Sequence, residues 1–172
     1  ALKRVMWRRV RHVVLYHVNA IERSDNLALI KLLNIKMERI RSMKNRKIKR
    51  WAMVDSQPAH YKPFERHLFD IVIDHHPCRD TTRSAELIDI RSGYGATSTI
   101  LCEYLHQAAM TPEIPLATAL LYGIRSDTQD LGREATKADI EAIEWLYPLA
   151  NKRMLSEIQR GSEPREYFQM LA

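Results

Sequence analysis

Two acidic residues and a pair of histidines stand directly after apolar segments of this sequence. Residues 69–73 form a short, largely apolar run that stops at the tetrapeptide DHHP at 74–77, and the run at 51–54 stops at Asp55. Burying several titratable groups side by side is costly unless something pairs with them, and a divalent cation would do so. Carboxylates and imidazoles without a thiolate suit Mn²⁺ or Mg²⁺ better than structural zinc. The pattern therefore indicates a metal site, or else polar strand ends that share no role.

Asp127 is a third acid that ends an apolar segment. Carboxylates able to bridge two cations are what a two-metal hydrolytic site requires, because one ion activates water while both neutralise phosphoryl oxygens. These residue types therefore fit the hydrolysis of a phosphate ester.

The elements that must position these residues alternate between strand and helix. Apolar runs predict strands, and cap residues and apolar spacing predict helices. Strands are expected at 12–16, 51–54, 69–73 and 85–90, the last at a sheet edge, and helices at 24–34, 99–109, 115–127 and 136–147, with two short helices after them. This alternation predicts an α/β fold with a mainly parallel sheet and helices on both faces. The polar residues that end parallel strands then emerge at one edge of the sheet, where such folds place their ligands.

The bulk composition is that of a single folded domain. The chain has 172 residues, of which 45% are hydrophobic and 28% charged, and no apolar stretch approaches the length of a membrane span. We find no signal peptide. Cys78 and Cys102 lack CxxC spacing, which favours free thiols in a reducing cytoplasm over a disulfide.

Positive charge is concentrated in the first part of the chain. Residues 1–50 hold 15 lysines and arginines against three acids, whereas the net charge of the whole chain is +6. Such a segment could face nucleic acid or an anionic substrate. For the basic run 44–50, a solvated surface is the simpler interpretation.

Four motifs in this order resemble the DHH phosphoesterases. They are Val54-Asp55-Ser56-Gln57-Pro58, Ile73-Asp74-His75-His76-Pro77, Gly95-Ala96-Thr97-Ser98-Thr99 and Gly123-Ile124-Arg125-Ser126-Asp127-Thr128. That family includes RecJ-type exonucleases, nanoRNases that also dephosphorylate pAp, cyclic dinucleotide phosphodiesterases and manganese pyrophosphatases. The resemblance extends over residues 1–160 and implies a Rossmann-like fold.

The resemblance implies a role for each matched residue. Asp55 is expected to bridge two Mn²⁺ or Mg²⁺ ions, with His75 and Asp127 as ligands of the second ion. His76 would contact the scissile phosphate or assist the leaving group, and Asp74 would orient the histidines.

Three further residues are expected near the substrate. Thr97 and Ser98 lie at a helix start whose free backbone N–H groups favour a phosphate, although an ordinary helix cap explains the turn equally well. Arg133, in the loop after Asp127, could reach a substrate phosphate or be a solvent-exposed loop arginine.

The sequence departs from the family pattern at both ends. The family's first motif, which supplies most ligands of the first ion, would lie before Ala1, because residues 1–10 read as the end of a helix. The pair His17 and Asn19 is a poor substitute, since it follows a strand at the wrong place. We therefore expect an N-terminally truncated, incomplete catalytic domain at 1–160, with 161–172 beginning a linker to a C-terminal domain that this chain lacks.

The function expected from these observations is metal-dependent hydrolysis of phosphoester bonds. The resemblance implies a nucleotide or a short single-stranded oligonucleotide as substrate, and a homodimer is compatible with it. The two isolated cysteines favour a cytoplasmic location, and without a long apolar stretch we expect no membrane partner. The alternative is a catalytically inactive fragment that binds nucleic acid or a protein partner through its basic N-terminal half.

Overall fold

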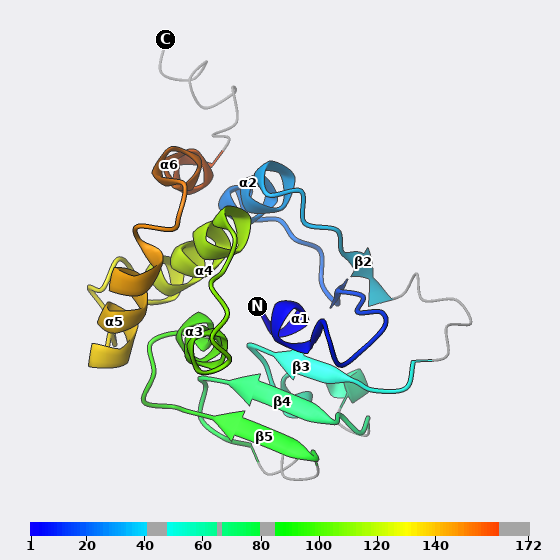
Figure 1. The fold of residues 1–172 in the computed structure, drawn as a ribbon. Coiled ribbons are helices and arrows are strands. Elements are labelled where there is room, and N and C mark those ends of the chain that lie inside the picture. Colours follow the sequence, from blue (N-terminus) through cyan, green and yellow to red (C-terminus); the bar gives the residue numbers. More distant parts are fainter. Residues whose placement is uncertain (41–47, 65–66, 80–84, 162–172) are drawn as a thin grey trace.

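The computed structural model of the chain describes residues 1–40, 48–64, 67–79 and 85–161. Strands and helices alternate in the first part of the chain, whereas four α-helices follow one another in its last part, as the sequence predicts (Figure 1). The strands are β1 (Tyr16–His17), β2 (Glu38–Arg39), β3 (Ala52–Val54), β4 (Ile71–Asp74) and β5 (Leu87–Ile90). The α-helices are α1 (Leu2–Met6), α2 (Ser24–Leu32), α3 (Thr97–Gln107), α4 (Ile114–Asp127), α5 (Lys137–Leu146) and α6 (Lys152–Arg160), and two 3-10 helices are η2 (Pro58–His60) and η3 (Lys62–Phe64). The basic run at 44–47 and the segment after 161 lie outside the described residues.

All strand pairs of the described chain are parallel, which confirms the predicted α/β class. β3, β4 and β5 form one sheet in that order, so β5 lies at an edge as predicted, while β1 and β2 pair separately. The predicted strand at 12–16 is therefore reduced to the short β1. The predicted strand at 69–73 begins later, because the Asp70 carboxylate accepts a hydrogen bond from the Trp51 backbone N–H at 2.6 Å.

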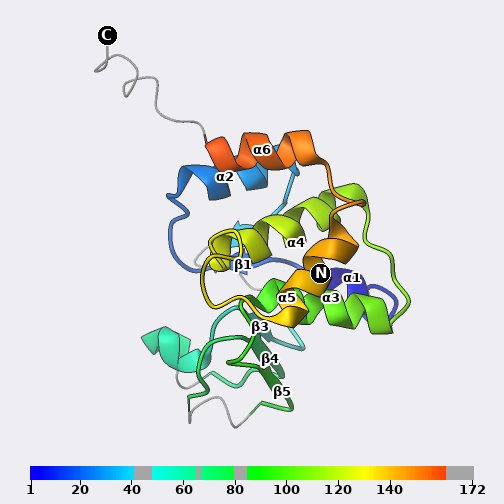
Figure 2. The same cartoon turned by 90° about the vertical axis from the view of Figure 1, so that its left-hand side faces the viewer.

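The α-helices of the described residues gather on one side of the three-stranded sheet. α3 lies against β4, α4 and α5 pack on α3, and α6 joins α2 to α4 farther out (Figures 1 and 2). The sequence predicts a helical layer on each face of the sheet. The α-helices of the described residues form the layer on one of these faces. None of the helices in the described ranges has both the length and the apolar character needed to cross a membrane.

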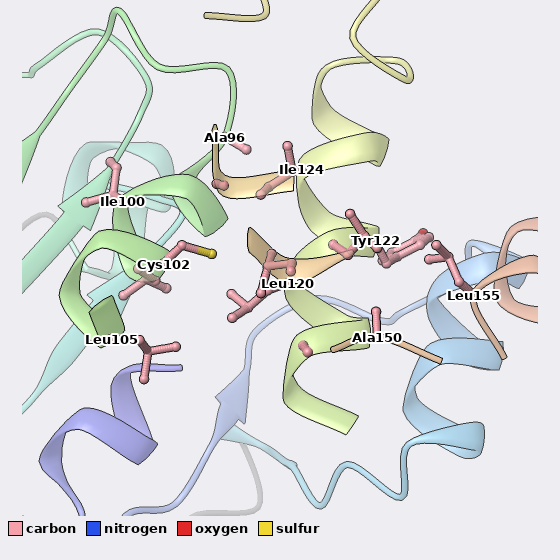
Figure 3. Close-up of a cluster of buried hydrophobic side chains, with 14 of the residues drawn as sticks. Ala96, Ile100, Cys102, Leu105, Leu120, Tyr122, Ile124, Ala150 and Leu155 are labelled. Carbon is pink, nitrogen blue, oxygen red and sulfur yellow. The ribbon is translucent and has the colours of Figure 1, made fainter. Parts of the chain in front are cut away.

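The hydrophobic core lies between α3, α4, α5 and α6. Figure 3 shows side chains from the facing sides of α3 and α4 meeting in its centre. Ile100, Leu121, Leu146 and Ile158, one from each of the four helices, are completely buried. Full burial of such side chains contributes roughly 2 kcal/mol each. The packed helical layer therefore stabilises the positions of the residues at its edge.

The charged side chain of Asp139 is completely buried beside this core. Thr136 precedes α5 and forms a capping box with Asp139, whose Oδ2 accepts hydrogen bonds from the Thr136 backbone N–H at 2.8 Å and its hydroxyl at 2.7 Å. The same carboxylate accepts from the Gly95 N–H at 2.9 Å and from the Thr99 hydroxyl at 2.5 Å. Asp139 therefore ties the start of α5 to the start of α3.

Glycine at position 95 is required by this close approach. A Cβ atom there would lie 2.6 Å from Thr128 Cγ2 and 2.7 Å from Asp139 Oδ2. The start of α3, the end of α4 and the start of α5 thus meet at one glycine.

We predict that Asp139→Asn destabilises the fold by about 2–3 kcal/mol at pH 7, because an amide cannot replace a carboxylate that accepts four hydrogen bonds. Burial alone would raise the pKa of Asp139, but bonds from Thr99, Thr136 and Gly95 outweigh it and hold the pKa below its usual value. The stabilisation is then present above the pKa of the unfolded chain, about 4, and is lost as the pH falls through the lower folded value. Urea unfolding at pH 7 and pH 3 measures this.

The control for this prediction is Glu141→Gln on the same helix, since Glu141 is exposed and its one ion pair within the described ranges is with Lys137. It should change the free energy of unfolding by less than about 0.5 kcal/mol. A loss in Asp139→Asn that is as large at pH 3 as at pH 7 would contradict the assignment of a charged Asp139.

A second close approach joins α3 to α4, and it predicts a coupled pair of substitutions. A Cβ at Gly123 would lie 2.3 Å from Ser98 Oγ but 3.3 Å from Ser98 Cβ. Gly123→Ala should therefore destabilise the fold, although alanine is about 1 kcal/mol better than glycine inside a helix. In the Ser98→Ala background the clash with the hydroxyl is gone, and the same change should be neutral or stabilising. Additive effects in a double-mutant cycle of thermal unfolding would show that the helices do not meet here.

Candidate metal centre

The parallel pairing of β3 and β4 brings the two predicted strand ends to one edge of the sheet. Val54 pairs with Ile73, and the Asp55 backbone N–H donates to the Ile73 carbonyl at 3.0 Å. At Asp55 the chain leaves the strand with a left-handed backbone, φ 59°. Aspartate tolerates this conformation better than most residues. Its carboxylate is exposed beside the end of β4.

His75 follows β4 and lies next to Asp55. Its Nδ1 is 3.2 Å from the Tyr94 backbone oxygen, and because a carbonyl can only accept, Nδ1 must carry the proton. The neutral ring then keeps a lone pair on Nε2, the state that a metal ligand needs. Nε2 lies 3.7 Å from Asp55 Oδ1. These two atoms are arranged as neighbouring ligands of one cation.

His76 is held by the buried carboxylate of Asp74. Its Nδ1 lies 2.8 Å from Asp74 Oδ1, which also accepts the His75 backbone N–H at 2.9 Å. Burial alone would lower the pKa of His76, but the hydrogen bond to Asp74 and the charges of Asp74, Asp55 and Asp127 raise it above its usual value. Because the carboxylate accepts the Nδ1 proton, Nε2 is the ring nitrogen left for another partner. The orienting role expected of Asp74 in catalysis stays a prediction.

Gln57 is a residue of the site that the sequence did not single out for a role. It is completely buried, and its Nε2 donates to Asp74 Oδ2 at 2.8 Å and to the Pro77 carbonyl at 3.1 Å. Its Oε1 accepts the Arg79 N–H at 2.7 Å. Gln57 thus holds the loop after β4 in place and satisfies the second oxygen of Asp74. In the sequence, the feature that could have pointed to Gln57 is its position two residues after Asp55.

Asp127 ends α4 near this group, although it is not part of the tightest cluster. Among the described residues, Asp55, His75 and His76 each offer a ligand atom, and these atoms lie within 4.8 Å of one another. Burial and the charge of Asp55 raise the pKa of Asp127 to about 6, although His75 and His76 act in the opposite direction. The carboxylates of Asp55 and Asp127 repel each other and lie near imidazole lone pairs. A bound cation would relieve this repulsion.

The three residues expected near the substrate have different surroundings. The Thr97 hydroxyl is buried and donates to Asp55 Oδ1 at 2.9 Å, so it orients the carboxylate that the cation would share. Ser98 lies instead against Gly123 of α4. Arg133 is 60% exposed and has Glu134 as its charged neighbour. A substrate contact by any of them stays a prediction.

The residues present fit a divalent cation of the Mn²⁺ or Mg²⁺ type. One carboxylate and two imidazoles with fixed tautomers converge, and both described cysteines are free. Cys78 is exposed and Cys102 is buried in the core. Among the described residues this cluster holds no thiolate, so the donor set favours a hard or borderline cation over structural zinc.

One sequence relative and one solved structure show what the chain is similar to. The chain is 36% identical over 148 residues to an uncharacterized protein of Methanocaldococcus jannaschii, a match that covers 86% of this chain and 30% of that protein. The structure of this chain resembles the crystal structure of a candidate family II inorganic pyrophosphatase of Methanococcus jannaschii. The TM-score is 0.67 at 21% identity, and the match covers 84% of this chain and 51% of the pyrophosphatase. No family model matches the chain. The chain therefore spans about a third to a half of these proteins, and shares the fold of the pyrophosphatase.

We predict that Thr97→Val weakens Mn²⁺ binding about tenfold, because loss of a hydroxyl that orients a metal ligand typically costs this much. Valine keeps the shape of threonine, so the protein should remain folded. Isothermal titration with Mn²⁺ measures the change. Ser98→Ala in the same turn is the matched control and should leave the affinity unaltered. Equal affinities of Thr97→Val and the unaltered chain would show that Thr97 does not orient Asp55.

Proposed function

We propose that this chain contributes to metal-dependent hydrolysis of phosphoester bonds in nucleotides or short single-stranded oligonucleotides. The observation that carries the proposal is the convergence of Asp55 with ring nitrogens of His75 and His76, two rings whose Nδ1 atoms each face an oxygen acceptor. The sequence resemblance to DHH phosphoesterases supports it, as does a fold shared with a candidate pyrophosphatase.

Each residue would have a separate task in this reaction. Asp55, His75 and Asp127 would hold the cations, with Thr97 fixing the direction of Asp55. A bound divalent cation would offset charge on the phosphoryl oxygens and ease the deprotonation of water. His76, whose side chain is 47% exposed against 17% for His75, is the better placed of the two to meet the substrate. With its raised pKa it would donate a hydrogen bond or a proton from Nε2 to the phosphate or the leaving group.

Several finer features belong to the same proposal. Mn²⁺ is the preferred ion and Mg²⁺ the second choice, and a homodimer is compatible with it. The free thiols are consistent with a cytoplasmic location. Residues 1–160 would form the catalytic domain and 161–172 would begin a linker.

The first experiment is a titration of the chain with Mn²⁺, read for stoichiometry, together with hydrolysis assays. The assays use pAp, a short oligoribonucleotide, a cyclic dinucleotide and pyrophosphate, and they are repeated on the longest gene product that carries this chain. Binding of Mn²⁺ with release of phosphate or a nucleoside monophosphate is the expected result. Failure to bind Mn²⁺ at all would overturn the metal site. The alternative of an inactive binding fragment predicts no hydrolysis in either form.

We predict that Asp55→Asn abolishes Mn²⁺ binding and any hydrolysis, because it removes the negative charge of the carboxylate that the cations would share. Both the affinity for Mn²⁺ and the rate of hydrolysis should fall at least about 100-fold. Asparagine tolerates the left-handed backbone of position 55 nearly as well as aspartate. The control is Asp130→Asn, an exposed carboxylate that pairs with Arg125 outside the cluster. Retention of Mn²⁺ binding in Asp55→Asn would contradict the proposed ligand set.

A further inference from the structure

A pocket lies at the other end of α3 from the candidate metal centre. It has a volume of ≈ 300 Å³ and is lined by Arg4, Trp7 and Arg8 and by the chain segment 108–111 that follows α3. The first residue of α3, Thr97, touches Asp55, whereas the pocket lies beyond its last turn. An α-helix of 11 residues is about 16 Å long. The pocket is therefore distinct from the candidate metal centre.

Arg4 is the most unusual residue of this pocket. Its guanidinium lies over the Trp7 ring, 5.4 Å from the ring centroid. Its Nε is shielded from solvent and has no hydrogen-bond partner among the described residues. A buried donor without a partner costs free energy, which sets Arg4 apart from the exposed Arg8 beside it.

Trp7 exposes a large aromatic surface in the lining of the same pocket. It is 58% exposed, which is unusual for the largest hydrophobic side chain. The pocket volume stands at the lower end of the range for ligand sites, so it suits one base or one phosphate rather than a large molecule.

The positive charges around the pocket have no carboxylate partners. Five cations stand within the first eleven residues without an acid among them, and none forms an ion pair with a described residue; they are Lys3, Arg4, Arg8, Arg9 and Arg11. A solvated helix face would account for exposed lysines and arginines alone. It does not account for an exposed tryptophan beside a guanidinium with a shielded, unbonded Nε.

We propose that this pocket binds single-stranded nucleic acid, with one base against Trp7 and a phosphate at Arg4 and Arg8. Stacking on an exposed aromatic ring beside a cationic track is how proteins hold single strands without reading their sequence. Cations outside the pocket, such as Lys3 and Arg11, would meet neighbouring phosphates, which favours a strand over a mononucleotide. The site uses none of the proposed metal ligands, so it stands independently of the proposed hydrolysis.

The test is fluorescence anisotropy with a labelled hexa-adenylate in the presence of EDTA, which prevents hydrolysis. Trp7→Ala should weaken binding about tenfold and Trp7→Phe much less, because phenylalanine keeps a stacking surface. Arg8→Ala should weaken binding and reduce the slope of log affinity against log salt by about 0.7. Circular dichroism of each variant checks that the fold is kept, and Arg8 is exposed enough to be replaced without loss of packing.

A matched control exists in the chain, since Lys152 Nζ lies 5.0 Å from the centroid of the Tyr147 ring. Tyr147→Ala and Lys152→Ala should change the affinity less than twofold. Equal losses in the Trp7 and Tyr147 variants would overturn the proposal. Displacement of the strand by inorganic phosphate or by an acidic peptide at similar concentrations would overturn it too, because it would show an anion site without base recognition.

Discussion

The buried carboxylate of Asp139 is the interaction on which the arrangement of the candidate site depends. A charge in the interior is tolerated only when it is fully hydrogen-bonded, and here four donors from two separate segments must be present at once. Two of these donors fix Gly95 and Thr99, on either side of Thr97. Thr97 in turn reaches the Asp55 carboxylate. The position of a surface acid is thus determined by an interior one on a helix more than 80 residues later in the sequence.

The sequence predicted those parts of the fold and site that depend on local patterns. Asp55 and the DHHP tetrapeptide end apolar runs, and parallel pairing of β3 with β4 brings such ends to one edge. The capping role of Thr136 was also visible, because a capping box lies within four residues. The division into two sheets was not, since the short pairing of β1 with β2 depends on contacts between distant segments.

The roles of Gln57 and Asp139 could not be predicted for the same physical reason. A glutamine three residues after a strand is expected to be exposed, and only the tertiary structure places it under Asp74. For Asp139, the local sequence shows the bond to Thr136 but says nothing of Gly95, 44 residues away. Thr97 was expected at the substrate because of its place in a helix start, whereas its hydroxyl is directed to Asp55.

The close contact between Ser98 and Gly123 has a consequence for how this sequence can vary. The two residues face each other where α3 and α4 nearly touch, and the space holds one side-chain oxygen but no additional methyl group. A larger residue at 123 is accepted more easily after a smaller one has appeared at 98. We therefore expect related sequences to keep these two positions as a pair, and their covariation would report the distance between the helices without any structure.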